Sequence, residues 1–276
     1  MRLFGQLLKY SPEFRGKARL VNIWLEWQRR LGEKAGTFER TLPGGFRLPC
    51  QLCVPYEAMI WLHREEEADL AVLRQLLRAG QTFVDCGANI GLWSLTAASC
   101  VMPEGKVFAF EPNPHTFRRL VQNLEFNKVA GIVEANNCAC GREAGDGFLT
   151  CPTEHNTCRM SSRAADNSVQ VKIVTLDDVL QKKRVHGIKI DVEGAEMEVL
   201  EGAKSVIRDS RPWICVEFNT LLAGVRRLGD WPVHHLLSSF NYSCCRFVDA
   251  IGSPRQFLKK EWETDAYINL FYWPSG

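Results

Sequence analysis

Short apolar runs alternate with helical periods along the middle of the chain. Between two such runs, Phe117, Leu120 and Leu124 repeat at the spacing of one helical face. Strands that alternate with helices predict a parallel sheet covered on both faces. We therefore expect a doubly wound α/β domain, with apolar strand-like runs at residues 82–84, 106–110, 187–190 and 213–218.

The rest of this domain follows from weaker patterns. The polar segment 141–168 is expected to be a hairpin or a mobile loop over the site, because no apolar period runs through it. Helices are expected at residues 65–79, 92–99, 115–127, 176–185 and in one piece across 197–207. Further strands are expected at residues 131–135, 171–174, 242–249 and 267–272.

The N-terminal segment has a pattern of its own. Leu20, Ile23, Trp24, Trp27 and Leu31 repeat at helical spacing before Gly32, and residues 38–54 resemble a loop or short hairpin. We expect a basic extension at residues 1–64 and one domain at residues 65–276.

Positive charge is concentrated in this extension. Residues 1–47 hold ten Lys and Arg against four Glu, so they carry 10 − 4 = +6, and the remainder carries +2 − 6 = −4. The apolar face of the basic helix has two interpretations. It packs on the catalytic domain, or it contacts an anionic membrane or a lipid-like or glycan acceptor.

The first strand runs into a loop that predicts a ligand site. Gly87 and Gly91 allow close approach of the backbone, and Gly91 opens an apolar helix whose N-terminus faces the same ligand. The second strand stops at Glu111, which lies 111 − 85 = 26 positions after Asp85. That spacing is near the one at which doubly wound folds place an acid on ribose hydroxyls. Asn89 either contacts the ligand or only shapes the loop.

The loop also indicates the cofactor. The dinucleotide pattern G-x-G-x-x-G is missing, and no Lys or Arg occurs in residues 82–102 to meet a phosphate. The site offers acids at Asp85 and Glu111 instead. A cationic ligand with a ribose, such as S-adenosyl-L-methionine (SAM), therefore fits better than a dinucleotide.

Four motifs in this order resemble those of FkbM-type SAM-dependent methyltransferases. The resemblance covers about residues 70–219 and implies a Rossmann-like class I methyltransferase domain with a seven-stranded sheet. It also implies O-methylation of a hydroxyl on a glycan or small-molecule metabolite. The motifs are Phe83-Val84-Asp85-Cys86-Gly87-Ala88-Asn89-Ile90-Gly91, Ala109-Phe110-Glu111-Pro112, Thr175-Leu176-Asp177-Asp178 and Ile188-Lys189-Ile190-Asp191-Val192-Glu193-Gly194-Ala195-Glu196.

Carboxylates near the ends of two later strands are the candidates for acid–base chemistry. Methyl transfer to a hydroxyl needs alignment and a base for the proton. Asp191 is the first candidate for base or acceptor orienter, followed by Glu193, Glu217 and, in the polar insert, His155. The cofactor-binding candidates are Asp85, Gly87, Asn89, Gly91, Glu111 and Asp191.

Composition narrows the class of protein and its cellular compartment. The chain is 46% hydrophobic and 24% charged, with a net charge of +2, which argues against a nucleic-acid binder driven by phosphate neutralisation. Eleven cysteines without repeating spacing indicate reduced thiols in a cytoplasmic protein, and Cys50-x-x-Cys53 has no second pair that would complete a metal site. Neither a signal peptide nor a membrane span is expected.

The sequence therefore predicts a SAM-dependent methyltransferase that acts on a small-molecule or glycan acceptor, with peripheral membrane contact through the basic helix as an open hypothesis. Two alternatives remain at this point. One is a nicotinamide-dependent oxidoreductase, and the other is a non-catalytic binding module with the same fold. The identity of the acceptor and the oligomeric state are not predicted.

Overall fold

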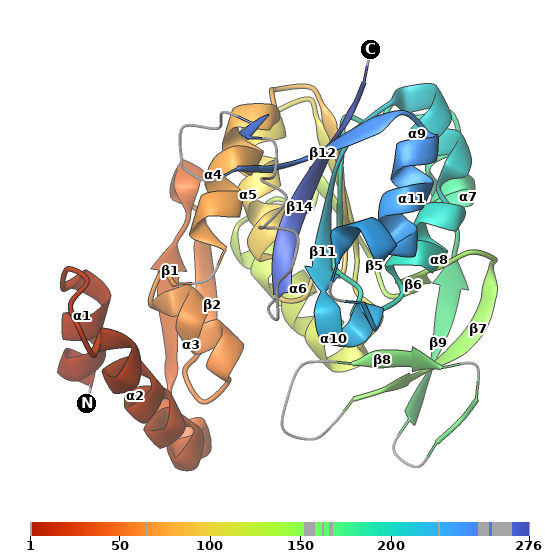
Figure 1. Cartoon of the computed structure of the whole chain (residues 1–276). Helices are drawn as coiled ribbons and strands as arrows, with labels where there is room; N and C mark the ends of the chain where they lie inside the picture. Colours follow the sequence, from red (N-terminus) through yellow and green to blue (C-terminus); the bar gives the residue numbers. More distant parts are fainter. Residues whose placement is uncertain are drawn as a thin grey trace.

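A central sheet with helices on both faces dominates the molecule (Figure 1). The computed structural model describes residues 2–64, 66–151, 158–161, 163–165, 168–225, 227–247, 254–255 and 267–275. The strands of the sheet lie in the order β13-β12-β14-β11-β10-β3-β4-β5. Their bounds are β3 Thr82–Cys86, β4 Lys106–Phe110, β5 Val133–Asn136, β10 Gly187–Ile190, β11 Trp213–Asn219, β12 Tyr242–Phe247, β13 Pro254–Arg255 and β14 Tyr267–Pro274.

The sheet is mostly parallel. Strands β5, β4, β3, β10 and β11 are parallel neighbours, whereas β14 is antiparallel to both β11 and β12. This arrangement confirms the doubly wound, seven-stranded sheet, to which β13 adds a short edge strand beside β12. Because parallel strands end at the same edge, the loops after β3, β4, β10 and β11 meet at the lower edge of the sheet in Figure 1.

Two hydrophobic cores flank the sheet. Phe83 faces one core and Val84 the other, because successive side chains of a strand point to opposite faces. The first core includes α4 Glu67–Leu76, α5 Leu92–Val101 and α6 Pro114–Phe126. The second includes α7 Leu176–Leu180, α8 Glu196–Glu201, α9 Lys204–Ser210, η3 Leu228–Asp230 and α11 Pro232–Ser239. The short helix α10 Thr220–Ala223 follows β11.

The polar insert forms a second sheet. Its strands are β6 Ala139–Cys140, β7 Gly145–Thr150, β8 Arg159–Ser161 and β9 Ser168–Val174, in the order β6-β9-β7-β8. The expected hairpin therefore exists as the antiparallel pair β7 and β8. The strand predicted at residues 171–174 also exists, but it pairs in this smaller sheet and not in the central one.

Three predicted helices are shorter than expected. The helix expected at residues 65–79 spans Glu67–Leu76. The helix after β9 ends at Leu180, where Gln181 takes φ 47°. The helix expected across residues 197–207 is broken into α8 and α9, because the Asp177 carboxylate accepts the amides of Ser205 and Val206 and so starts a new helix. Asp177, which belongs to one of the four motifs, thus has a structural role.

The N-terminal segment consists of a helical hairpin and a two-stranded ribbon (Figure 1). Both the helix before Gly32 and the hairpin in residues 38–54 are confirmed. The elements are α1 Arg2–Tyr10, α2 Lys17–Leu31, η1 Gly32–Ala35, β1 Thr37–Thr41, η2 Pro43–Gly45, β2 Arg47–Gln51 and α3 Pro55–Trp61.

This segment is anchored on the first core. Trp24 is buried and stacks on Trp61, with ring centroids 5.9 Å apart, and the buried Glu57 carboxylate pairs with Arg119 of α6. The boundary between residues 64 and 65 stays a prediction, while side chains on both sides of it share one core. Among the described helices, none is long and apolar enough to cross a membrane.

Candidate functional site

The loop after β3 is built around Gly87. Its φ of 82° is in the left-handed region, and a Cβ there would lie 1.8 Å from the carbonyl oxygen of Asp191, so the position requires glycine. The amides of Gly87 and Ala88 both donate to the Phe110 carbonyl, at 3.0 and 2.9 Å. These bonds fasten the loop to the end of β4, and the close approach of Gly87 to Asp191 brings the end of β10 to the same point.

Glu111 is the acid at the end of β4. Its side chain is buried, and its two oxygens accept the amides of Asn89 and Asn113, each at 2.9 Å. Burial raises the pKa of Glu111 to about 7, although both amide hydrogen bonds lower it. An ionised carboxylate has about four lone-pair sites, so two remain for the hydroxyls of a ribose.

Asp191, after β10, is held by an ion pair with Lys189. Lys189 Nζ lies 2.9 Å from Asp191 Oδ2, and the lysine is buried in the sheet. Burial lowers the pKa of Lys189, but the carboxylates of Asp191, Glu66 and Asp85 outweigh it and raise the pKa above its usual value. The lysine therefore stays charged and fixes the direction of the Asp191 carboxylate.

The same lysine links the N-terminal part of the chain to the site. Glu66, which precedes α4, accepts hydrogen bonds from the Tyr56 hydroxyl at 2.6 Å and from the indole of Trp93. The ammonium of Lys189 lies 5.4 Å from the centroid of the Trp93 ring. A partly buried network therefore runs from the α3–α4 region to Asp191.

Asp85 lies behind the loop. Its residue is fully buried, Oδ2 accepts the Ser94 hydroxyl at 2.6 Å, and Oδ1 has no hydrogen-bond partner among the described residues. Burial raises the pKa of Asp85. Asp85 is opposite Lys189 in the strand register, so it belongs to the buried network and supports the loop from inside.

Three more carboxylates gather after β10 and on β11. Burial, together with the Asp191 charge, raises the pKa of Glu193 to about 7 and that of Glu217 to about 9. Glu196 is buried at the start of α8 and accepts the amide of Gly194 at 2.9 Å. Near neutral pH, Glu193 is therefore able to take up a proton, whereas Glu217 already holds one.

These strand ends enclose a cavity of about 720 Å³ that is open to solvent. The second sheet supplies an apolar wall that includes Leu149 and Met160. The cavity is lined by Gly87, Asn89, Phe110, Glu111, Pro112, Thr116, Cys138, Ala139, Cys140, Leu149, Cys158, Met160, Asp191, Val192, Glu193 and Ala195.

Comparison with known proteins identifies the family. Residues 85–240 match the family described as the methyltransferase FkbM domain, and this match includes the loop, Glu111 and the carboxylates after β10. The chain belongs to the FkbM methyltransferase family. This family and the Rossmann-like sheet agree with the prediction from the four motifs.

Relatives of this FkbM-family chain include several named methyltransferases. Methyltransferase 1 of Beauveria bassiana is 36% identical over 43% of this chain and 57% of the relative. The hexuronic acid methyltransferase AglP of Haloferax volcanii is 31% identical over 54% of this chain and 62% of the relative. The chain thus spans about three-fifths of the length of these two curated relatives.

Two further similarities carry the family name itself. The 31-O-demethyl-FK506 methyltransferase FkbM of Streptomyces tacrolimicus is 30% identical over 52% of this chain and 68% of that protein. The crystal structure of methyltransferase FkbM from Methylobacillus flagellatus KT has a TM-score of 0.44 and 14% identity, covering 94% of this chain and 60% of that one.

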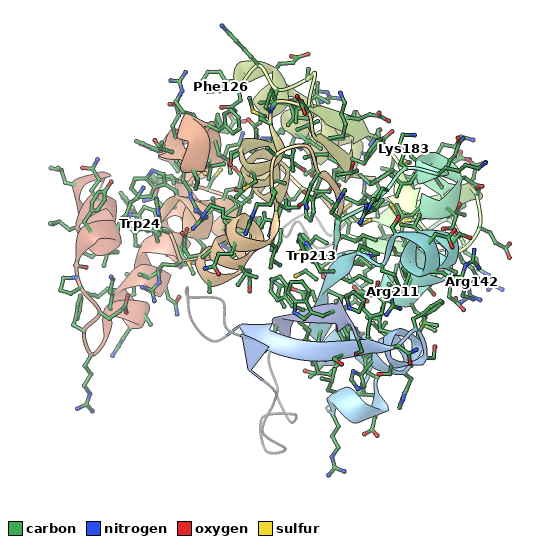
Figure 2. The ribbon with its side chains drawn as sticks, turned by 90° about the horizontal axis from the view of Figure 1, so that it is seen from above. Trp24, Phe126, Arg142, Lys183, Arg211 and Trp213 are labelled. Atoms are coloured by element: carbon green, nitrogen blue, oxygen red, sulfur yellow. A yellow bond between two sulfur atoms is a disulfide. The ribbon has the colours of Figure 1, made fainter. Side chains whose placement is uncertain are left out.

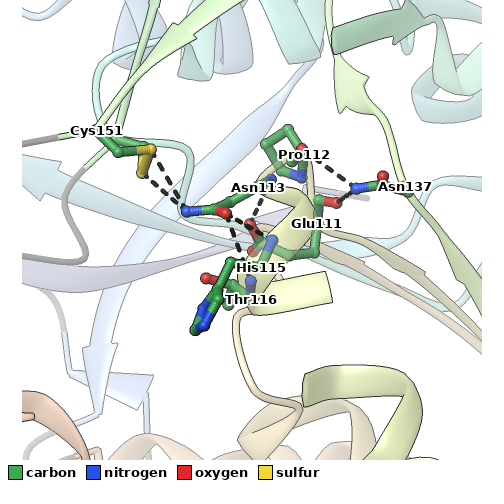
Figure 3. Close-up of a disulfide and its surroundings, with 8 residues drawn as sticks. Glu111, Pro112, Asn113, His115, Thr116, Asn137 and Cys151 are labelled. Carbon is green, nitrogen blue, oxygen red and sulfur yellow. Dashed lines mark hydrogen bonds between the residues drawn. A yellow bond between two sulfur atoms is a disulfide. The ribbon is translucent and has the colours of Figure 1, made fainter. Parts of the chain in front are cut away.

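The FkbM-family site includes a disulfide that the sequence did not predict. All cysteines were expected to be reduced, which is wrong for Cys151 and Cys158, whose Cα atoms are 4.2 Å apart and whose sulfurs are bonded. The pairing of Thr150 with Arg159 in the β7–β8 hairpin places the two cysteines opposite each other. Asn113 Nδ2 lies 3.4 Å from each sulfur, while its Oδ1 accepts amides of the first turn of α6 (Figure 3). Cys158 also lines the cavity.

The predicted site residues that the structure describes fall into three groups. Gly87, Asn89, Glu111, Asp191 and Glu193 line the cavity. Asp85 and Gly91 support the loop without lining the cavity. Glu217, which belongs to β11, lies beside Asp191. His155 lies outside the described residues.

The structure also adds residues that sequence reasoning missed. Sequence reasoning assigned no role to Lys189, although a lysine between two isoleucines of a buried strand indicates a paired charge. Asn113 was missed too, and its Asn-Pro dipeptide after Glu111 is a recognisable helix start. Leu149 and Met160, in the apolar wall, come from the second sheet and had no sequence signal.

Proposed function

We propose that this protein transfers a methyl group from SAM to a hydroxyl of a glycan or small-molecule metabolite. The observation that carries the proposal is the Glu111 carboxylate. It is buried, it is held by two backbone amides, and it lies in the same cavity as Gly87 and Asp191. A carboxylate at this strand end is well suited to bind the two hydroxyls of a ribose.

The cavity residues fit SAM better than a dinucleotide. SAM has no phosphate, and its sulfonium and ammonium charges suit a wall that contains Glu111, Asp191 and Glu193. Among the described residues that line the cavity there is no lysine or arginine to meet a pyrophosphate. In addition, the amides of Gly87 and Ala88 already donate to the Phe110 carbonyl, so the loop does not offer them to a phosphate.

The chain's own residues then have distinct tasks. SAM supplies an electrophilic methyl group. Glu193 accepts the proton of the acceptor hydroxyl, because its pKa of about 7 suits a base at neutral pH. Asp191, whose direction is fixed by Lys189, accepts a hydrogen bond from the acceptor and orients it. Such alignment contributes up to roughly 7–11 kcal/mol to catalysis.

The names of two relatives support oxygen as the methylated atom. One relative is named as a hexuronic acid methyltransferase, and the other acts on a compound named as 31-O-demethyl-FK506. Both names refer to compounds that offer oxygen atoms for methylation. We infer the same reaction class for this chain and leave the acceptor itself open.

A methyl-transfer assay with Glu193→Gln tests this assignment. The protein is incubated with methyl-labelled SAM and a panel of sugars, uronic acids and matched amino sugars. At saturating SAM, we expect kcat toward hydroxyl acceptors to rise with pH with an apparent pKa of about 7 or lower, since the base must be ionised and the positive charge of bound SAM lowers the pKa of Glu193 from about 7. Glu193→Gln should lower kcat by roughly 10²–10⁴-fold and abolish the rise.

Glu198→Gln is the matched control, because Glu198 is an exposed carboxylate on α8 and should leave the profile unchanged. Transfer to amines but to no hydroxyl would overturn O-methylation. An unchanged pH profile in Glu193→Gln would remove Glu193 from the role of base.

A further inference from the structure

Helices α1 and α2 form a hairpin at one end of the molecule (Figure 1), and neither helix contributes a residue to the lining of the cavity. Only their inner side packs on the protein. Leu8, Val21 and Trp24 are buried there, and a Cβ on Gly5 would touch the Trp24 ring at 2.8 Å. Figure 2 shows Trp24 within this end of the molecule. Packing is therefore the role of the Trp24 side of α2.

The outer side of the hairpin is also apolar. Leu3, Leu7 and Tyr10 follow one another at helical spacing on α1 and are 75%, 68% and 77% exposed. Ile23 on α2 is 57% exposed, and Phe14 in the connection between the helices is 47% exposed. We call Leu3, Leu7, Tyr10, Phe14, Leu20 and Ile23 the outer apolar face.

This face is unusual within the molecule. It contains six of the ten large apolar side chains that are exposed among the described residues, although it lies within residues 3–23. Single exposed apolar residues are normal on a protein surface, but a concentration of them marks a contact site. A helix that only packed on the domain would have a polar outer side.

The charge of the hairpin indicates what kind of surface the outer apolar face contacts. Residues 2–31 hold seven Lys and Arg and two Glu, so they carry 7 − 2 = +5, and the rest of the chain carries +2 − 5 = −3. Both acids are already paired, Glu13 with Lys17 and Arg64, and Glu26 with Arg29 and Arg30. Arg15 and Arg19 are exposed.

We propose that the outer apolar face docks on an anionic lipid surface. Apolar side chains enter the headgroup region of such a surface while lysines and arginines meet its negative charge, which is the behaviour of basic amphipathic helices. A second copy of this chain would bring another charge of +5 against the first, so like-charge repulsion disfavours the hairpin as a dimer interface. The proposal concerns only the hairpin and does not depend on methyl transfer.

Vesicle flotation of the full chain tests the docking. The vesicles contain phosphatidylglycerol and phosphatidylcholine in equal parts, or phosphatidylcholine alone, at low and at high salt. We expect the protein to float with the anionic vesicles at low salt and to be released at high salt. Leu3→Gln/Leu7→Gln should weaken binding by roughly tenfold or more, because two inserted leucines are lost. Arg15→Gln/Arg19→Gln should weaken binding to anionic vesicles on the order of tenfold.

Phe126→Gln is the matched control, because Phe126 is 43% exposed and ends α6 on another part of the surface (Figure 2). It should float like the wild type. Thermal melting checks that every variant is folded. If folded wild-type protein stays at the bottom of the gradient at low salt, the proposal is wrong. Self-association through Leu3 and Leu7 without flotation would also overturn it and assign the face to a second copy.

Discussion

Gly87→Ala is expected to destabilise the protein by roughly 2–5 kcal/mol and to abolish measurable SAM binding. Overpacking costs about 1–3 kcal/mol and a left-handed backbone at a non-glycine residue about 1–2 kcal/mol. The new Cβ would lie 1.8 Å from the Asp191 carbonyl oxygen, so β10 and the loop have to separate. Each 1.4 kcal/mol of binding free energy that this displacement removes lowers the affinity for SAM tenfold. Urea unfolding measures the loss of stability, and calorimetry measures the loss of SAM binding.

Gly45→Ala separates backbone strain from the clash. Gly45 has the same φ of 82° and nothing within 4 Å of its Cβ position. Gly45→Ala should lower the free energy of unfolding only by the backbone contribution of about 1–2 kcal/mol and leave SAM binding intact. Equal stability loss and equal SAM affinity in both variants would show that Gly87 does not pack on Asp191 in solution.

Lys189→Met is expected to cost about 3–5 kcal/mol of folding free energy, since it leaves the buried Asp85 and the partly buried Asp191 without their counter-charge. Asp191→Asn keeps the shape of the site. It should lower kcat by roughly 10²-fold while SAM affinity stays within a few-fold, because the acceptor loses its fixed hydrogen-bond partner. The double variant should be more stable than Lys189→Met alone, because one uncompensated charge is removed with the lysine.

Lys106→Met is the control for the lysine, because Lys106 is exposed at the start of β4 and should change stability by no more than about 0.5 kcal/mol. If stability losses of Lys189→Met and Asp191→Asn simply add, the two side chains are not coupled. If Asp191→Asn instead loses SAM binding with unchanged kcat at saturation, Asp191 is part of the cofactor site.

The central sheet was predictable because its strands are apolar on both faces. Buried parallel strands such as β4 give continuous apolar runs, here from Val107 to Phe110, and the acids that follow such strands lie at the shared strand edge. The second sheet was harder to predict. Its strand Gly145–Thr150 contains two glycines and an aspartate, so it has little strand character by itself. It exists because β9 and β8 pair with it on either side.

The roles of individual site residues depend on facts that the sequence does not contain. Asp85 was expected either to organise the loop or to contact the ligand. Its position in the pleat favours the first role, because its side chain faces the first core, where Lys189 is its neighbour in the strand register. The disulfide depends on hairpin register in the same way. Gly87 and Glu111 were predictable because backbone approach and a strand-end acid are local features.

Calorimetry with SAM, S-adenosylhomocysteine and NAD tests the central claim most directly. The wild-type chain should bind SAM and S-adenosylhomocysteine and bind NAD poorly. Glu111→Gln should weaken SAM binding by roughly ten- to hundredfold, because hydrogen bonds to a charged group contribute about that much to affinity. Glu134→Gln, an exposed acid on the neighbouring strand β5, should bind SAM like the wild type. Tight NAD binding without SAM binding would contradict the assignment of this cavity to SAM.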